Sequence, residues 1–85
     1  MPIISQFYGI IISMFWDDHN PPHFHARYGE YEIIAEIKTG KVSGKFPARA
    51  LGLVQEWRAL HENDLMEDWE LACKKEALKK IQPLE

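Results

Sequence analysis

Cysteine is nearly absent from this sequence, which contains a single one, Cys73. One thiol cannot form an internal disulfide or a cysteine-based zinc cluster. Such sparse use of cysteine is typical of proteins that work in a reducing compartment. We therefore expect a cytoplasmic protein.

The chain also lacks an excess of basic charge and a membrane-spanning run. Its formal net charge is −3 at pH 7, whereas proteins that bind nucleic-acid phosphates usually carry a basic surface patch. The apolar opening, MPIISQFYGIIISMFW, has neither the basic region nor the small-residue cleavage site of a secretory signal. It is too short for a membrane span, and two aspartates end it. The sequence thus supports neither a nucleic-acid partner nor a membrane partner.

What the chain does contain is enough apolar side chains for one core. Of its 85 residues, 46% are hydrophobic, and they include three Trp, four Phe and three Tyr. A chain of this size buries only about 60% of its unfolded surface, so the large aromatic side chains matter for stability. No repeat or linker divides the sequence, and we expect residues 1–85 to form a single domain.

Four short apolar runs, separated by turn signals, predict β-strands in the first half of the chain. The predicted strands are residues 9–16, 23–28, 31–38 and 41–46. Helix-forming sequence follows, from Pro47 to about His61 and then, after a cap at Asn63 or Asp64, toward Lys80. The sequence therefore predicts an α+β fold, a four-stranded antiparallel meander followed by two helices packed on one face.

The register of the second and third strands follows from a two-residue turn at Gly29-Glu30, which pairs Tyr28 with Tyr31. Alternation then gives a core face made of Phe24, Ala26, Tyr28, Tyr31, Ile33 and Ala35. The opposite face pairs His23 with Glu36, His25 with Ile34, and Arg27 with Glu32. Histidines, carboxylates and an arginine should therefore gather on the side away from the core.

The first predicted strand is apolar on both faces. Pairing Phe15 with Phe24 in the core would place on the outer face, beside the histidines, an apolar patch of Ile10, Ile12, Met14, Trp16 and Ile34. A bare patch of this kind favours a partner or a closed two-fold homodimer. The alternative is that residues 1–6 or the C-terminal tail fold back and cover the patch.

The side chains best suited to catalysis or metal binding are concentrated in residues 17–28, DDHNPPHFHARY, which hold three of the four histidines. His23 and His25 leave a strand in the same direction, as a two-histidine metal site requires. A divalent ion such as Zn²⁺ would take a third ligand from Glu36, Asp17, Asp18 or His19. The same cluster could instead supply acid and base groups without a metal.

Two other interpretations of this segment stay open. The residues could make recognition contacts, for which the candidates are His19, Asn20, His23, His25, Arg27 and Tyr28, with Trp16 and Met14 from the neighbouring patch. Alternatively the face is simply solvated, and His23–Glu36 and Arg27–Glu32 are exposed cross-strand ion pairs worth only ~0–1 kcal/mol each.

The segment from Asp18 to Tyr28, together with the opening MPIISQFYGI, resembles a family of short bacterial proteins grouped as a domain of unknown function. The shared signature is Asp-His-Asn-Pro-Pro-His-Phe-His-Ala-x-Tyr, and the resemblance covers essentially the whole chain. Members are often encoded beside a second small protein, so the resemblance implies one half of a toxin–antitoxin-like pair. It supplies no catalytic residues.

Two functions follow as hypotheses. The leading one is an interaction module that binds a second copy or a small operon-encoded protein through its outer sheet face and histidine loop. The alternative is a small metal-assisted or His-dependent hydrolase, such as an RNA-cleaving toxin, with catalytic candidates His23, His25, Glu36 and Asp18. The acidic net charge counts against a nuclease.

Overall fold

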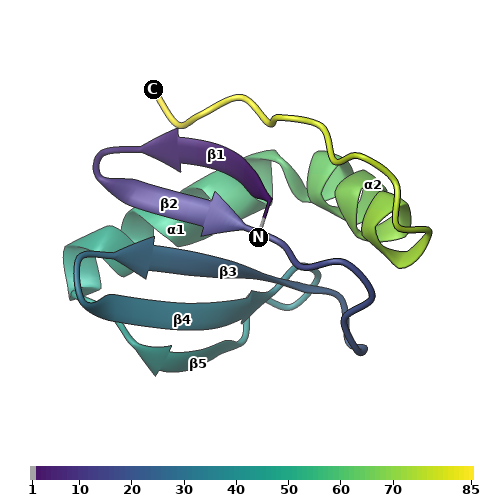
Figure 1. The fold of residues 1–85 in the computed structure, drawn as a ribbon. Helices are drawn as coiled ribbons and strands as arrows, with labels where there is room; N and C mark the ends of the chain where they lie inside the picture. The colour runs from purple at the N-terminus through teal and green to yellow at the C-terminus, as the bar shows by residue number, and fades with distance from the viewer. Residues whose placement is uncertain (1) are drawn as a thin grey trace.

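The computed structural model describes residues 2–85, which form five β-strands followed by two α-helices. The elements are β1 (Ile3–Phe7), β2 (Ile10–Ser13), β3 (His23–Tyr28), β4 (Tyr31–Glu36), β5 (Val42–Lys45), α1 (Ala48–Leu60) and α2 (Glu62–Cys73). The strands make one antiparallel sheet whose spatial order follows the chain (Figure 1). The α+β class and the order of strands before helices are confirmed, with one strand more than predicted.

The additional strand comes from the N-terminal segment. Tyr8 and Gly9 both have positive φ, 50° and 81°, as the two central residues of a type I′ hairpin turn require. This turn splits the apolar opening into β1 and β2 and pairs Phe7 with Ile10. The first strand was predicted to begin at Gly9, and residues 1–6 were predicted only as a segment that could fold back over the sheet. Met1 lies outside the described residues.

The predicted register between β3 and β4 is confirmed. Tyr28 pairs with Tyr31 across the turn, and every pair back to His23 and Glu36 is as expected. The core face carries the buried side chains Phe24, Ala26, Ile33 and Ala35. The two tyrosines nearest the turn lie at the margin of the core and stay 38% and 48% exposed.

The predicted register of β2 is wrong by one residue. Ile12 pairs with Ala26, and Ser13 pairs with His25, so the expected pairing of Phe15 with Phe24 does not occur. A shift of one residue turns every side chain to the opposite face of a sheet. The predicted apolar patch therefore does not exist, because its members Ile10, Ile12 and Met14 are fully buried in the core. Met14 is not available as a binding residue, whereas Trp16 and Ile34 are 50% and 39% exposed.

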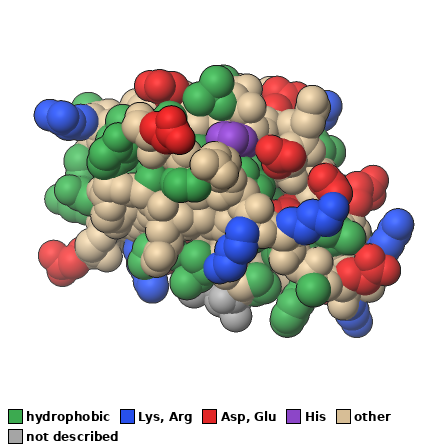
Figure 2. Space-filling model, turned by 90° about the horizontal axis from the view of Figure 1, so that it is seen from above, with side chains coloured by type: hydrophobic (Ala, Val, Ile, Leu, Met, Phe, Trp, Pro, Cys, Tyr) green, Lys and Arg blue, Asp and Glu red, His purple; other side chains and the backbone are tan. Residues whose placement is uncertain are grey.

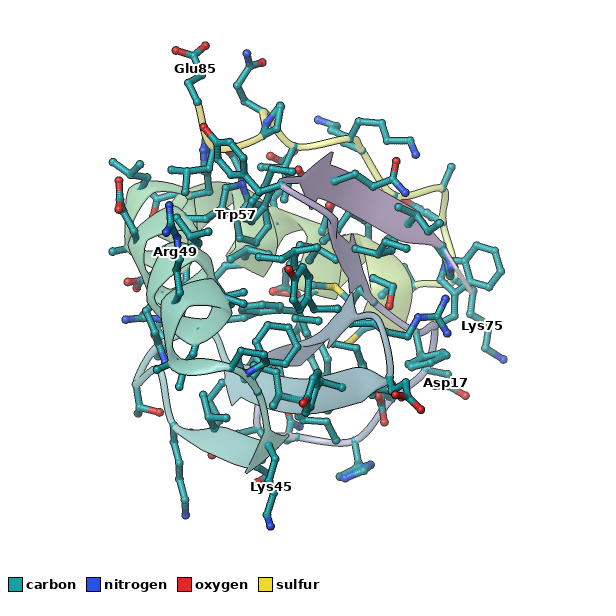
Figure 3. The ribbon with its side chains drawn as sticks, turned by 90° about the vertical axis from the view of Figure 1, so that its left-hand side faces the viewer. Asp17, Lys45, Arg49, Trp57, Lys75 and Glu85 are labelled. Carbon is teal, nitrogen blue, oxygen red and sulfur yellow. The ribbon has the colours of Figure 1, made fainter. Side chains whose placement is uncertain are left out.

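Helix α1 lies across one face of the sheet, and α2 lies beside one end of the sheet (Figure 1). The indole of Trp57 points inward from α1 (Figure 3) and lies 5.4 Å from the Phe7 ring and 5.8 Å from the Phe24 ring, between centroids. Helix α2 buries Leu65, Trp69 and Ala72, whereas Cys73 is exposed. Across residues 2–85, neither helix has the length and apolar character needed to span a membrane.

Residues 74–85 follow α2 as a segment without helix or strand that runs along the β1 edge (Figure 1). The Ile81 amide donates to the Ile4 carbonyl at 2.7 Å, and Trp57 Nε1 donates to the Gln82 carbonyl at 2.8 Å. The predicted continuation of the helix toward Lys80 is therefore wrong, because α2 ends at Cys73. The C-terminal segment instead occupies backbone groups of β1 that an edge strand would otherwise leave open.

Asp68 joins this segment to α2. Its Oδ1 accepts the Lys79 amide at 2.9 Å, while its Oδ2 is buried without a hydrogen-bond partner. Burial raises the pKa of Asp68 above its ordinary value, and the nearby carboxylates of Glu67 and Asp64 add to the rise although the Lys79 amide opposes it. A raised pKa means that, between the unfolded and folded pKa values, the folded state binds more protons than the unfolded state does.

We expect Ile81→Ala to lower the free energy of unfolding by about 2–4 kcal/mol, because it empties a buried position where the C-terminal segment meets the core. Urea unfolding at pH 7 measures the change. Gln82→Ala is the matched control: its side chain is exposed and its bonded group is the backbone carbonyl, so stability should barely change. Equal effects of the two substitutions would contradict the assigned role of the segment.

The raised pKa of Asp68 predicts that its contribution to stability is fully present below the pKa of the unfolded state and is lost as the pH rises through the folded pKa. Asp68→Asn keeps an oxygen for the Lys79 amide and cannot ionise. Its stability relative to the unmodified protein should therefore increase from pH 4 to pH 8, as followed by thermal unfolding. Exposed Glu70→Gln should show no such trend, and a pH-independent difference for Asp68→Asn would refute the prediction.

Candidate functional site

The histidine-rich segment folds as a loop between β2 and β3 and then as the start of β3. Asp17 has φ 59°, and its amide donates to the Ala72 carbonyl of α2 at 3.2 Å. The Asn20–Pro21 peptide bond is cis. The loop is thus tied to α2 and turns Asp18 back toward the first side chains of β3.

Three side chains meet at this point, and we call Asp18, His23 and His25 the histidine–aspartate cluster. Asp18 Oδ2 lies 2.9 Å from His23 Nε2 and 3.8 Å from His25 Nε2. One ligand atom from each residue lies within 4.8 Å of the other two. The side chains are 18%, 6% and 14% exposed, respectively. The cluster is therefore sheltered but still reachable from the surface.

His23 is held on both sides of its ring. Nδ1 lies 2.8 Å from the Pro21 carbonyl oxygen, Nε2 lies 2.9 Å from Asp18 Oδ2, and the Trp69 ring packs 5.2 Å away between centroids. Both polar partners are acceptors, and a neutral imidazole has only one N–H to donate. Both contacts are satisfied only if a second proton or another cation lies between the ring and Asp18.

His25 lies beside His23 in a more apolar setting. The Phe15 ring meets it edge-on at 4.4 Å between centroids, and both ring nitrogens are buried without a hydrogen-bond partner. Burial lowers the pKa of His25, and positive charge on His23 lowers it further, although Asp18 and Glu32 oppose the shift. A depressed pKa keeps this imidazole neutral at neutral pH, with a lone pair available.

Asp18 is the charged centre of the cluster. Its partial burial raises its pKa, but hydrogen bonds from the His19 amide and the His23 ring outweigh that effect, so the pKa of Asp18 is lower than usual. His19 lies at the rim: its side chain is 86% exposed, and its Nδ1 is 3.0 Å from Asp18 Oδ1. His19 is not among the three residues whose ligand atoms converge.

Other predicted site residues lie apart from the cluster or have different partners. Glu36 is opposite His23 in the ladder, but its carboxylate accepts from Thr39 Oγ1 at 2.8 Å, and the predicted His23–Glu36 ion pair is not formed. Glu32 likewise approaches His25 Nδ1, at 3.7 Å, and within residues 2–85 makes no ion pair with Arg27. The exposed Asn20 lies in the loop, and Tyr28 lies at the far end of β3 beside Phe46, 6.2 Å away between ring centroids.

Sequence reasoning did not identify two neighbours of the cluster. Trp69 of α2 packs on His23, and Phe15 packs on His25. Trp69 recurs at helical spacing with Leu65 and Ala72, a pattern that indicates burial but not the residue it will cover. Phe15 was assigned to the core because the β2 register was off by one.

Two shallow hollows flank Ile34 on the outer face of the sheet, the face away from α1. One is lined by His19, Pro21, His23, Glu36 and Lys41, and the other by His25, Glu32, Ile33 and Gly44; both also include Ile34 and Ser43. Seen from above the β1 edge and the C-terminal segment, acidic and basic side chains are interspersed on the surface (Figure 2). Both hollows border the histidine–aspartate cluster.

The fold and site define a small α+β domain with a sheltered histidine–aspartate cluster at the outer face of its sheet. The family model for the domain of unknown function DUF4160 matches residues 9–70, and the chain belongs to this family. The matched region includes the whole cluster. No curated protein and no solved structure matches the chain.

Asp18→Asn should lower the free energy of unfolding by about 1–3 kcal/mol, because it removes the charge that satisfies the buried His23 ring. Thermal unfolding at pH 7 in the presence of a chelator measures this effect without bound metal. The neighbouring Asp17 is 71% exposed and lies 3.8 Å from an exposed lysine, so Asp17→Asn should change stability little. Similar losses for both substitutions would contradict the central role of Asp18.

Proposed function

We propose that this protein is a cytoplasmic interaction module, one half of a bacterial toxin–antitoxin-like pair, and that it binds a small partner protein through the outer face of its sheet. The observation that carries this proposal is the exposure of Ile34 on this face, which α1 leaves uncovered because α1 lies on the opposite side of the sheet (Figure 1). The association with a co-encoded protein rests on the family resemblance of the signature.

The outer face has the features of a modest recognition surface. Ile34 is 39% exposed and separates the two hollows, so a partner side chain can enter on either side of it. Trp16, in the loop before the cluster, is 50% exposed and its Nε1 donates to the Glu76 carbonyl at 3.0 Å. An aromatic side chain held in place at the surface loses little entropy on binding.

The partner we infer is a protein of different sequence. A homodimer was expected through a patch of five residues, and the burial of Ile10, Ile12 and Met14 leaves only Trp16 and Ile34 of that patch exposed. The formal net charge of −3 likewise favours a protein surface over a phosphate backbone. Self-association through Ile34 is the competing outcome.

A second candidate function is a metal-assisted hydrolase, and the histidine–aspartate cluster favours it. The metal-free, His-dependent version fits less well, because both nitrogens of His23 already face acceptors and cannot take a proton from a substrate. His25 is neutral and partly accessible, which suits a ligand or a base.

Ile34→Asp should weaken binding to the co-encoded partner by at least about tenfold, a loss of about 1.4 kcal/mol or more, because it places a charge at the centre of the contact. Calorimetric titration with the purified partner measures the affinity. Leu60→Asp is the matched control, since Leu60 is 66% exposed on α1, outside this face. Sedimentation of the protein alone tests self-association. Equal binding by both variants, or a dimer broken by Ile34→Asp without a partner, would overturn the proposal.

A further inference from the structure

We propose that the histidine–aspartate cluster is a binding site for a divalent transition-metal ion, with Zn²⁺ the best fit. The ligand atoms would be Asp18 Oδ2, His23 Nε2 and His25 Nε2, which converge at the edge of the outer face. The proposal goes beyond the interaction function and does not depend on it. It rests on three features of the cluster: the tautomer of His23, the ring nitrogens of His25 that lack hydrogen-bond partners, and the distances between the ligand atoms.

The first feature is the tautomer of His23. Nδ1 lies 2.8 Å from the Pro21 carbonyl, which accepts but cannot donate, so Nδ1 carries a proton. In the neutral ring Nε2 then presents a lone pair to the Asp18 carboxylate at 2.9 Å. Two lone pairs repel at this distance, so a second ring proton in the metal-free protein, or a metal ion that displaces it, must lie between them. Metal-bound histidines characteristically donate their other ring N–H to a carbonyl or carboxylate in this way.

The second feature is the state of His25. Both of its nitrogens are buried without a hydrogen-bond partner, an arrangement that costs stability and is uncommon in folded proteins. Nδ1 faces Glu32 Oε2 at 3.7 Å, and Nε2 faces Asp18 Oδ2 at 3.8 Å. A metal ion on Nε2 would satisfy that nitrogen and direct the remaining N–H toward Glu32. His25 would then repeat the pattern of His23, with Nε2 to the metal and Nδ1 to an oxygen.

The third feature is the spacing of the ligand atoms. Zinc bonds to nitrogen and oxygen are about 2.0–2.2 Å long, so two ligands at a tetrahedral angle lie about 3.4 Å apart. The separations of 2.9 Å and 3.8 Å from Asp18 Oδ2 fall on either side of that value. Small side-chain rotations would therefore bring the ligands to bonding geometry without moving the backbone of β3.

The chemical nature of the three ligand side chains determines which metal ions the site prefers. Two imidazoles and one carboxylate suit Zn²⁺ and neighbouring transition metals, whereas Mg²⁺ and Ca²⁺ prefer oxygen ligands throughout. Three protein ligands leave a fourth position open to water or to a group brought by another molecule. The hollows that His23 and His25 line give that position access to the outer face.

The test is titration of the full chain, first stripped with a chelator, with Co²⁺ as an optical probe and then with Zn²⁺. We expect one Co²⁺ per chain, with visible absorption bands of tetrahedral strength that Zn²⁺ abolishes at one equivalent. On Zn²⁺ addition, the ¹⁵N resonances of Nε2 in His23 and His25 should shift more than those of His61. An absence of stoichiometric Co²⁺ binding would overturn the proposal.

Two histidine variants make the test specific. His25→Gln should weaken Zn²⁺ binding by at least about tenfold; this substitution should leave the fold intact, because the His25 ring makes no hydrogen bond. His61→Gln removes the one histidine outside the loop and β3, whose Nδ1 lies 3.3 Å from Asp64 Oδ2, and should bind Zn²⁺ as the unmodified protein does. Circular dichroism confirms folding of both. Unchanged affinity in folded His25→Gln, or equal loss in His61→Gln, would refute the assigned ligands.

Discussion

The pairing of β3 with β4 is the constraint on which the rest of the molecule depends. The tight turn between Tyr28 and Tyr31 fixes which residues face each other, and the two-residue period of a strand then assigns every side chain to one face. Phe24 and Ala26 therefore enter the core beneath Trp57, and His23 and His25 turn the other way. One register thus creates both the hydrophobic core and the cluster, and a slip of one residue would destroy both.

The cluster needs more than this hairpin. Asp18 comes from a loop whose position is set by α2, through the hydrogen bond from the Asp17 amide to the Ala72 carbonyl. Trp69, also from α2, closes one side of His23. The three side chains are therefore assembled by elements from both halves of the chain. Such a site is rigid only when the helices are docked on the sheet, which makes its geometry dependent on the stability of the whole domain.

The sequence predicted the parts of the structure that depend on local patterns. The hairpin register was predictable because only one face of β3 and β4 is apolar, and His23 and His25 were identified because alternation places them together. The register of β2 was not predictable in this way, since residues 10–16 are apolar on both faces. Which of these two faces turns toward the core depends on what β1 and α1 can cover. The convergence of Asp18 on the histidines depends on a loop conformation that no periodicity encodes. The hydrogen bond between Ile81 and Ile4 joins distant parts of the chain, and no local sequence pattern in either segment indicates it.

The C-terminal segment along β1 also has a consequence for synthesis on the ribosome. A chain emerging from its N-terminus can form the hairpins early, because their contacts are local. The Ile4 carbonyl, however, accepts from the Ile81 amide, and Ile81 is synthesised long after β1. During that interval the β1 edge is exposed, and exposed strand edges are where nascent chains associate wrongly. The time between the first strand and the last residues of the domain is thus a period of vulnerability, which a slower rate of translation would lengthen.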